Sequence, residues 1–195
     1  MHIPKKGLRA LGIAESCHGR SVSRLAGVVM RKDLRIDGFA FSTVTVGGMD
    51  ASISILHMVK DLKRRDINVI MLSGCVIAWF NIINASLIVQ ETGIPVICVT
   101  YEDSEGLFGD IRHHFPDDEA RISAYENLGE RTLVKLHTHQ TIFIRCWGLN
   151  LEDAAKLCND FTLEGSIPEP LRVARLCARH SPYSPFNEGI NEGVK

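Results

Sequence analysis

The chain has 195 residues, of which 45% are hydrophobic and 23% are charged, and its formal net charge is −1. This composition indicates one globular domain with its own hydrophobic core and excludes a disordered chain. The near-neutral charge excludes a general electrostatic attraction to nucleic acid or membranes, so any polyanion site must be a local patch.

The first predicted elements are three strands. Apolar stretches rich in β-branched residues predict strands at 8–14, 22–30 and 36–46, joined through a turn and a hairpin connection. Gly47 and Gly48 interrupt the pattern, and apolar residues at helical spacing then predict a helix from Asp50 to about residue 65.

The next elements alternate between strand and helix. A strand at 68–72, a helix at 78–91 and a strand at 95–101 indicate a parallel crossover unit. A short acidic helix at 116–126, a hairpin over 133–147 and two closing helices at 151–159 and 168–179 complete the chain.

This order predicts an α/β, single-domain ribonuclease H-like fold. Its mixed sheet has three antiparallel strands followed by parallel strands and flanking helices, and a generic α/β sandwich is the alternative. The domain is expected to span 1–181, and 182–195, rich in Pro, Ser, Gly and Asn, is expected to form a flexible tail.

Six scattered cysteines form no C-x-x-C pair, and three of them lie in apolar stretches: Cys75, Cys98 and Cys146. Reduced core thiols, no secretory leader and no membrane span predict a cytoplasmic protein. Trp79 and Trp147 also lie within apolar runs and are expected in the core.

Several stretches resemble a known family, the archaeal endonuclease dU proteins, which are similar to endonuclease V. The matching stretches are "LGIAES", "GVVMR", "DGFAFSTVTVGGMDAS", "LSGCVIAWFNIIN", "TGIPVICVTY" and "EGSIPEPLRVARL". They occur in the order typical of the family over about nine-tenths of the chain. The resemblance implies a ribonuclease H-like nuclease that incises DNA containing deoxyuridine.

Such nucleases hold one or two Mg²⁺ or Mn²⁺ ions with carboxylates from neighbouring strand ends and a helix. The resemblance implies acidic residues at three positions where this chain has Ala14, Ser73 and Asn84. Glu15 and Asp50 remain acidic, so they are the predicted catalytic and metal-binding residues. Because strand residues alternate between faces, Glu15 needs a local bulge to replace an acid at position 14.

Each of these residues also has a structural interpretation. Glu15 can be a surface acid at a strand end, Asp50 can be the N-cap of its helix, and Ser73 can be a turn residue without the G-x-S-x-G pattern of a nucleophile.

The predicted nucleic-acid-binding residues are Arg20, Asn81, Asn84, Arg172 and Arg175. The two asparagines would share one helix face and recognise a flipped uracil, or else satisfy backbone groups under a loop. The arginines would contact phosphates, with Arg172 alternatively paired to Glu169. The family often has histidine where this chain has Arg175.

The remaining patterns do not indicate a zinc site or a nucleotide-binding site. His137 and His139 would share a strand face, but no three- or four-ligand zinc spacing is present. Neither a P-loop nor a dinucleotide fingerprint supports a small-molecule enzyme.

The sequence therefore agrees with two functions. One is a Mg²⁺- or Mn²⁺-dependent endonuclease whose partner is deoxyuridine-containing DNA. The other is a catalytically inactive relative that binds damaged or single-stranded nucleic acid or a protein partner.

Overall fold

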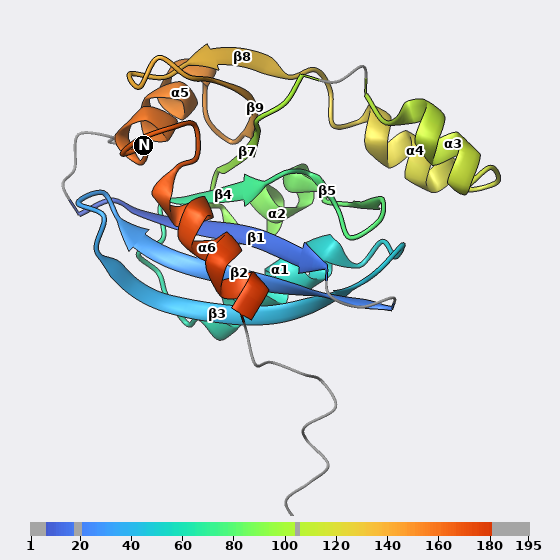
Figure 1. The fold of residues 1–195 in the computed structure, drawn as a ribbon. Helices are drawn as coiled ribbons and strands as arrows, with labels where there is room; N and C mark the ends of the chain where they lie inside the picture. The colour runs from blue at the N-terminus through green and yellow to red at the C-terminus, as the bar shows by residue number, and fades with distance from the viewer. Residues whose placement is uncertain (1–6, 18–20, 104–105, 181–195) are drawn as a thin grey trace, which may run out of the picture.

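A computed structural model describes residues 7–17, 21–103 and 106–180. One seven-stranded mixed sheet forms its centre, with the strand order β3-β2-β1-β4-β7-β9-β8 (Figure 1). These strands are β1 (Arg9–Cys17), β2 (Val22–Arg31), β3 (Ile36–Thr45), β4 (Val69–Ser73), β7 (Val96–Thr100), β8 (Thr132–Lys135) and β9 (Thr141–Trp147). Strands β1, β4 and β7 run parallel, and the other neighbours pair antiparallel.

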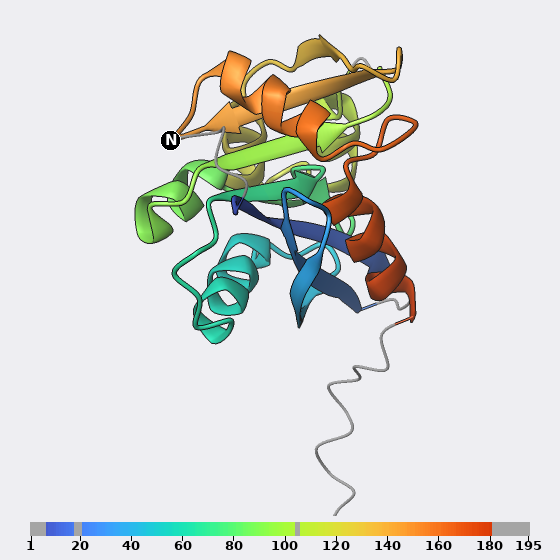
Figure 2. The ribbon, with the colours of Figure 1, turned by 90° about the vertical axis from the view of Figure 1, so that its left-hand side faces the viewer.

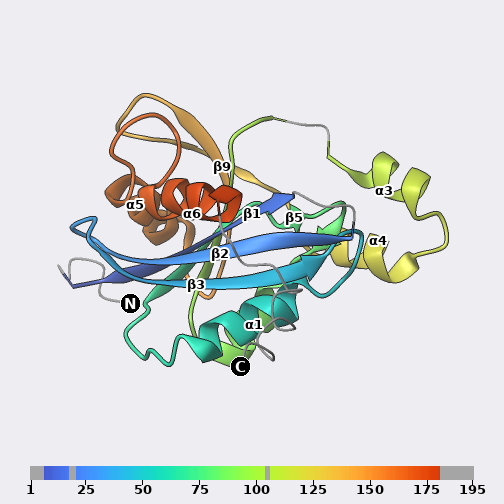
Figure 3. The same ribbon diagram turned by 60° about the horizontal axis from the view of Figure 1, so that its bottom comes forward.

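Helices cover both faces of this sheet. The helices are α1 (Ala51–Asp61), α2 (Ala85–Thr92), α3 (Phe108–His114), α4 (Glu119–Glu126), α5 (Leu151–Asp160) and α6 (Glu169–His180). Figures 2 and 3 show α1 and α6 on opposite faces. The sequence predicts all but one of the helices, and the missing one, α3, has only seven residues. The predicted mixed α/β sheet of the ribonuclease H-like class is confirmed.

The alternation of strand residues creates two hydrophobic cores. Leu11 and Ile13 of β1 contribute to the core under α1 and α2, whereas Ala10 and Ala14 contribute to the core under α5 and α6. Adjacent residues at a strand end therefore face different helices.

The segment after β4 differs from the prediction. Instead of a helix from residue 78, it forms a small hairpin of β5 (Val76–Ile77) and β6 (Asn81–Ile82), and α2 begins only at Ala85. Ala78, Trp79 and Phe80 form the hairpin tip with φ angles of 41°, 59° and 61°. This left-handed backbone costs a residue with a Cβ atom about 1–2 kcal/mol, so the tip is strained.

Two further predictions are wrong. Trp79 is 56% exposed rather than in the core, while Trp147 packs, partly buried, against the core under α1 and α2. His137 and His139 lie in the turn between β8 and β9 and so share no strand face. Among the cysteines, Cys75 and Cys98 are buried free thiols as expected, and Cys146 is half-buried.

The tail predicted at 182–195 lies outside the described residues. Within the described ranges, no helix has both the length and the apolar run that a bilayer crossing needs.

Candidate functional site

Strands β1, β3, β4, β7 and β8 end at the same end of the sheet. Strands β1, β4 and β7 are parallel, and β3 points the same way because it is antiparallel to β2, which is antiparallel to β1. Thr45, Ser73 and Thr100, the last residues of β3, β4 and β7, therefore lie at this end together with Glu15, which is two residues before the end of β1. In open α/β sheets this end, beyond the carboxyl termini of the strands, is where ligands bind.

The central pair at this end is Ser73 with Arg175. Arg175, on α6, donates hydrogen bonds from Nε and Nη2 to the Ser73 hydroxyl oxygen, at 3.0 Å and 2.8 Å. The guanidinium carbon also lies 4.4 Å from the ring centroid of Tyr101, just beyond β7. Alternation along β4 puts Ser73 on the face covered by α6, on the same side as Ala14.

A cavity of about 440 Å³ opens beside this pair. Its lining residues are Ser73, Gly74, Val99, Thr100, Tyr101, Glu102, Arg131, Ser166, Ile167 and Arg175. Burial raises the pKa of Tyr101 to about 12, although the Arg175 guanidinium acts to lower it. Tyr101 therefore stays neutral near pH 7.

Arg175 has hydrogen-bonding capacity left. A guanidinium carries five N–H groups, and Ser73 takes two of them, so three remain. Among the described residues, no carboxylate lies within 4 Å of this side chain. The cavity is thus bordered by a cation that forms no ion pair with a described acid, although Glu102 lines the same cavity.

Close packing holds α6 in place. A Cβ atom at Gly12 of β1 would lie only 2.5 Å from the Cβ atom of Pro170. Glycine is therefore required here for α6 to approach β1 so closely. On the same helix, Arg172 binds the buried Glu169 carboxylate at 2.7–3.0 Å, which is the alternative considered from the sequence.

Glu15 lies on the other face of the sheet. Alternation places it with Leu11 and Ile13 toward α1 and α2, and its carboxylate accepts a hydrogen bond from the buried Ser23 hydroxyl. The local bulge that would turn Glu15 toward α6 is absent, because β1 pairs with β2 in continuous register from Arg9 to Cys17. Glu15 does not take the place of an acid at position 14.

Asp50 is at the N-cap position of α1, but its side chain does not cap that helix. The carboxylate instead accepts hydrogen bonds from the Thr45 hydroxyl at 2.7 Å and from the Asn81 amide at 2.6 Å. Partial burial acts to raise the pKa of Asp50, but these hydrogen bonds outweigh it and lower the pKa below its usual value. Asp50 is therefore ionised and held in a fixed position.

The two asparagines do not share a helix face. Asn81 is fully buried in β6, where its amide donates to Asp50 and to the Thr45 carbonyl while its oxygen accepts from the Ala51 N–H. Asn84 is the N-cap of α2, and its side chain accepts a hydrogen bond from the Leu87 N–H at 3.0 Å. Both satisfy backbone groups, as the structural alternative predicted. Arg20 lies outside the described residues.

The residues at this end do not fit a Mg²⁺ or Mn²⁺ site. Such ions need several oxygen ligands, but Ala14 has none and the Ser73 hydroxyl is bound by a guanidinium cation. In the part of the chain that the structure describes, no three His, Cys, Asp or Glu side chains converge. Glu15 and Asp50 each have their own hydrogen-bond partners, and no described contact joins them.

The sequence also did not reveal a buried arginine that supports the hairpin tip. Arg121 of α4 is 4% exposed and donates to the carbonyls of Gly47, Gly48 and Phe80. Its guanidinium stacks 3.9 Å from the centroid of Phe115, and Nε binds Asp118 at 3.0 Å. No signal in the sequence separates Arg121 from an ordinary surface arginine.

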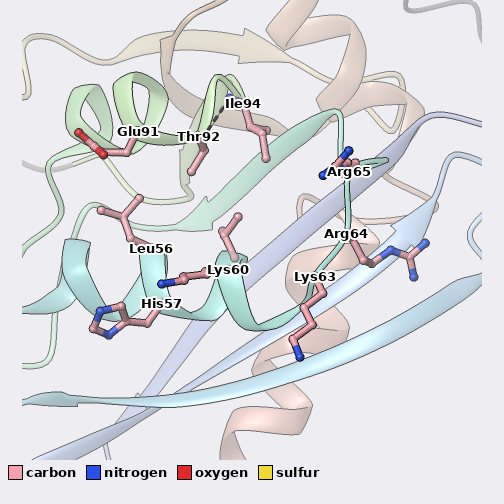
Figure 4. A pocket seen from close by; sticks show the side chains of 10 residues that line it. Leu56, His57, Lys60, Lys63, Arg64, Arg65, Glu91, Thr92 and Ile94 are labelled. Carbon is pink, nitrogen blue, oxygen red and sulfur yellow. Dashed lines mark hydrogen bonds between the residues drawn. The ribbon is translucent and has the colours of Figure 1, made fainter.

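A groove of about 560 Å³ between α1 and α2 is lined by several cations, including Lys60, Lys63 and Arg65 (Figure 4). It lies at the opposite end of the sheet, where both helices end. A helix C-terminus carries partial negative charge, and Lys60, in the last turn of α1, complements it.

The chain matches the family model described as Endonuclease dU over residues 6–181. A UPF0215 protein of Pyrobaculum calidifontis is 39% identical over 160 residues, covering 80% of this chain and 86% of that protein. A UPF0215 protein of Methanosarcina barkeri is 33% identical over 177 residues, covering 89% and 90%.

Solved structures share the fold. A protein of unknown function from Archaeoglobus fulgidus superposes with a TM-score of 0.76 at 27% identity, covering 88% of this chain and 96% of that one. Endonuclease V of Ciona intestinalis, crystallised with DNA containing an inosine, gives a TM-score of 0.61 at 17% identity, covering 89% and 85%. This chain belongs to the endonuclease dU family and has the ribonuclease H-like fold of endonuclease V.

Proposed function

We propose that the protein binds DNA at the end of the sheet where Arg175 meets Ser73, and that it does not cleave DNA by a metal-dependent route. The observation that carries this proposal is the guanidinium of Arg175 on the Ser73 hydroxyl, at 3.0 Å and 2.8 Å. The family supports a nuclease-like function. In this chain the Arg175 guanidinium stands on Ser73, which favours binding of a phosphate over binding of a metal ion.

Arg175 suits a phosphodiester. Its planar guanidinium keeps three N–H donors for an anionic oxygen, and Ser73 and Tyr101 fix its orientation from two sides. The cavity beside it, about 440 Å³, gives a phosphate room to approach. Protein–DNA complexes make many of their hydrogen bonds to phosphate oxygens in this way.

Metal-dependent cleavage requires carboxylates on the α6 face of the sheet, beside Ser73. The α6 face offers a methyl group at Ala14 and a hydroxyl at Ser73, and Glu15 faces away from α6. A divalent ion would also be repelled by the guanidinium. Binding without cleavage therefore agrees better with these side chains.

The test measures the salt dependence of DNA binding by fluorescence anisotropy. Arg175→Gln is expected to weaken binding and to reduce the slope of log K against log salt concentration by about 1, the effect of losing one phosphate contact. Arg65→Gln is the matched control, because it removes the same charge at the other end of the sheet. Equal slopes for the wild type and Arg175→Gln would reject the phosphate role.

A second function is retained because two acids reach this end of the sheet. The family match favours it: the protein would then nick deoxyuridine-containing DNA, and Glu15 and Asp50 would have to leave their present hydrogen-bond partners to bind Mg²⁺ or Mn²⁺. Incubation of DNA carrying one deoxyuridine with each metal, and with chelator, separates the two functions. We expect no nicking. Metal-dependent nicking that is lost in both Glu15→Ala and Asp50→Ala would instead establish the nuclease.

A further inference from the structure

The hairpin tip displays an aromatic side chain outward. Trp79 is 56% exposed although tryptophan is among the largest apolar side chains, and the neighbouring Phe80 is only partly exposed. The tip follows Ser73 by a few residues, and Asn81 ties it to Asp50. It therefore extends from the same end of the sheet as the Arg175 site.

The outward position of Trp79 is built into the backbone. Three consecutive residues with Cβ atoms have left-handed φ angles of 41°, 59° and 61°. Such strain persists only where the surroundings enforce it, and it is commonest at functional sites. Here the Gly47 N–H binds the Ala78 carbonyl at 2.8 Å, and buried Arg121 binds the Phe80 carbonyl.

The neighbours of the indole leave part of it open. Its ring centroid lies 4.8 Å from that of His114 and 5.2 Å from that of Phe80. The last turn of α3 adds the basic side chains Arg112, His113 and His114, of which His114 contacts the indole and Arg112 carries a permanent positive charge. An aromatic ring beside cations is the combination that binds single-stranded nucleic acid, since bases stack on the ring while cations contact phosphates.

We infer that Trp79 is a stacking site for an unpaired nucleobase of single-stranded DNA, supported by His114 and held in place by Arg121. This inference rests on the proposed DNA binding and specifies which form of DNA is preferred. The site is rigid before binding, because its backbone and its arginine support are fixed by the fold. A side chain and backbone that are already ordered lose less conformational entropy when the ligand binds.

The experiment uses the fact that the chain has only two tryptophans. In a Trp147→Phe variant, fluorescence reports Trp79 alone. The probes are a single-stranded oligothymidylate of about 12 nucleotides, within the usual range of site sizes, and an abasic oligomer with the same number of phosphates. Anisotropy of the labelled oligomers gives the affinity independently.

Stacking predicts that oligothymidylate quenches Trp79 and the abasic oligomer does not. Trp79→Ala should weaken oligothymidylate binding about 5- to 100-fold, as expected for one stacked base, and leave abasic binding unchanged. Trp79→Phe should restore most of the affinity. Because the side chain is exposed, circular dichroism of Trp79→Ala should match the parent.

The experiment separates a failure of the stacking inference from a failure of the proposed DNA binding. If neither oligomer nor a duplex of the same length binds, the proposed DNA binding itself fails, and the inference with it; if only the duplex binds, DNA binding stands and the stacking inference is overturned. If both bind without quenching and Trp79→Ala binds normally, DNA binding stands and the stacking inference is overturned. Self-association that Trp79→Ala abolishes without changing DNA affinity would assign the tip to contact with a second copy.

Discussion

Asn81 and Asp50 are joined by a 2.6 Å hydrogen bond between the hairpin after β4 and the start of α1. The same amide also binds the Thr45 carbonyl and the Ala51 N–H, so one fully buried side chain connects β3, α1 and β6. An exposed loop acid at position 50 thereby becomes a fixed carboxylate.

Asn81→Ala should therefore destabilise the protein more than Asn84→Ala does. The first leaves the buried Ala51 N–H unsatisfied, at about 1–3 kcal/mol, and also removes the hydrogen bonds to Asp50 and Thr45, whereas the second removes only an N-cap, at about 1 kcal/mol. Urea unfolding of the two variants measures the difference. Equal losses would mean that the Asn81 contacts contribute no more than a cap.

Asp50 should make stability depend on acid pH. Its pKa is lowered in the folded state, so its contribution is full above the unfolded value near 4 and is lost as the pH falls through the lowered folded value. Asp50→Asn should be less stable than the wild type at pH 6, and this difference should shrink toward pH 3. Urea unfolding across this range checks it; a constant difference would contradict the pKa shift.

Gly12→Ala should push α6 away from β1. The added methyl group meets Pro170, and overpacking of this kind costs about 1–3 kcal/mol. Gly109→Ala is the control, because nothing lies within 4 Å of a Cβ atom there. Chemical denaturation of both variants should show a loss only for Gly12→Ala, and its affinity for DNA should fall as Arg175 moves.

Restoring acids alone should not restore a metal site. In an Ala14→Asp, Ser73→Asp double variant, Arg175 is expected to form an ion pair with the new Asp at position 73, because it already binds the hydroxyl there. Mn²⁺ binding, measured by calorimetry, should appear only when Arg175→His is added. Tight Mn²⁺ binding by the double variant would show that Arg175 does not block the site.

Much of the fold follows from the sequence, since β1 to β4 and α6 have clear periodicities. The hairpin of β5 and β6 was missed because left-handed turns normally carry Gly or Asn, whereas this tip carries Ala78, Trp79 and Phe80. An apolar run with such residues indicates a helix, and the hairpin depends on tertiary contacts made by Arg121, Asn81 and the Gly47 N–H.

The candidate site was predicted in location but not in its contacts. The sequence pointed to the ends of β1 and β4. The pairing of Ser73 with Arg175, however, spans 102 positions and depends on the close packing of α6 against Gly12. A signal was present, because Ser73 and Arg175 both depart from the residues that the family resemblance implies. These two departures meet in space, which no single position reveals.

Arg121 links three segments that are far apart in the sequence. Its three carbonyl contacts join the turn after β3, the tip after β5 and the helix α4, so these segments form one cooperative unit of local unfolding. Opening any one of them breaks bonds to the others. Hydrogen–deuterium exchange of the protected amides in these three segments should therefore report a common opening free energy, although Gly47 and Arg121 are 74 positions apart.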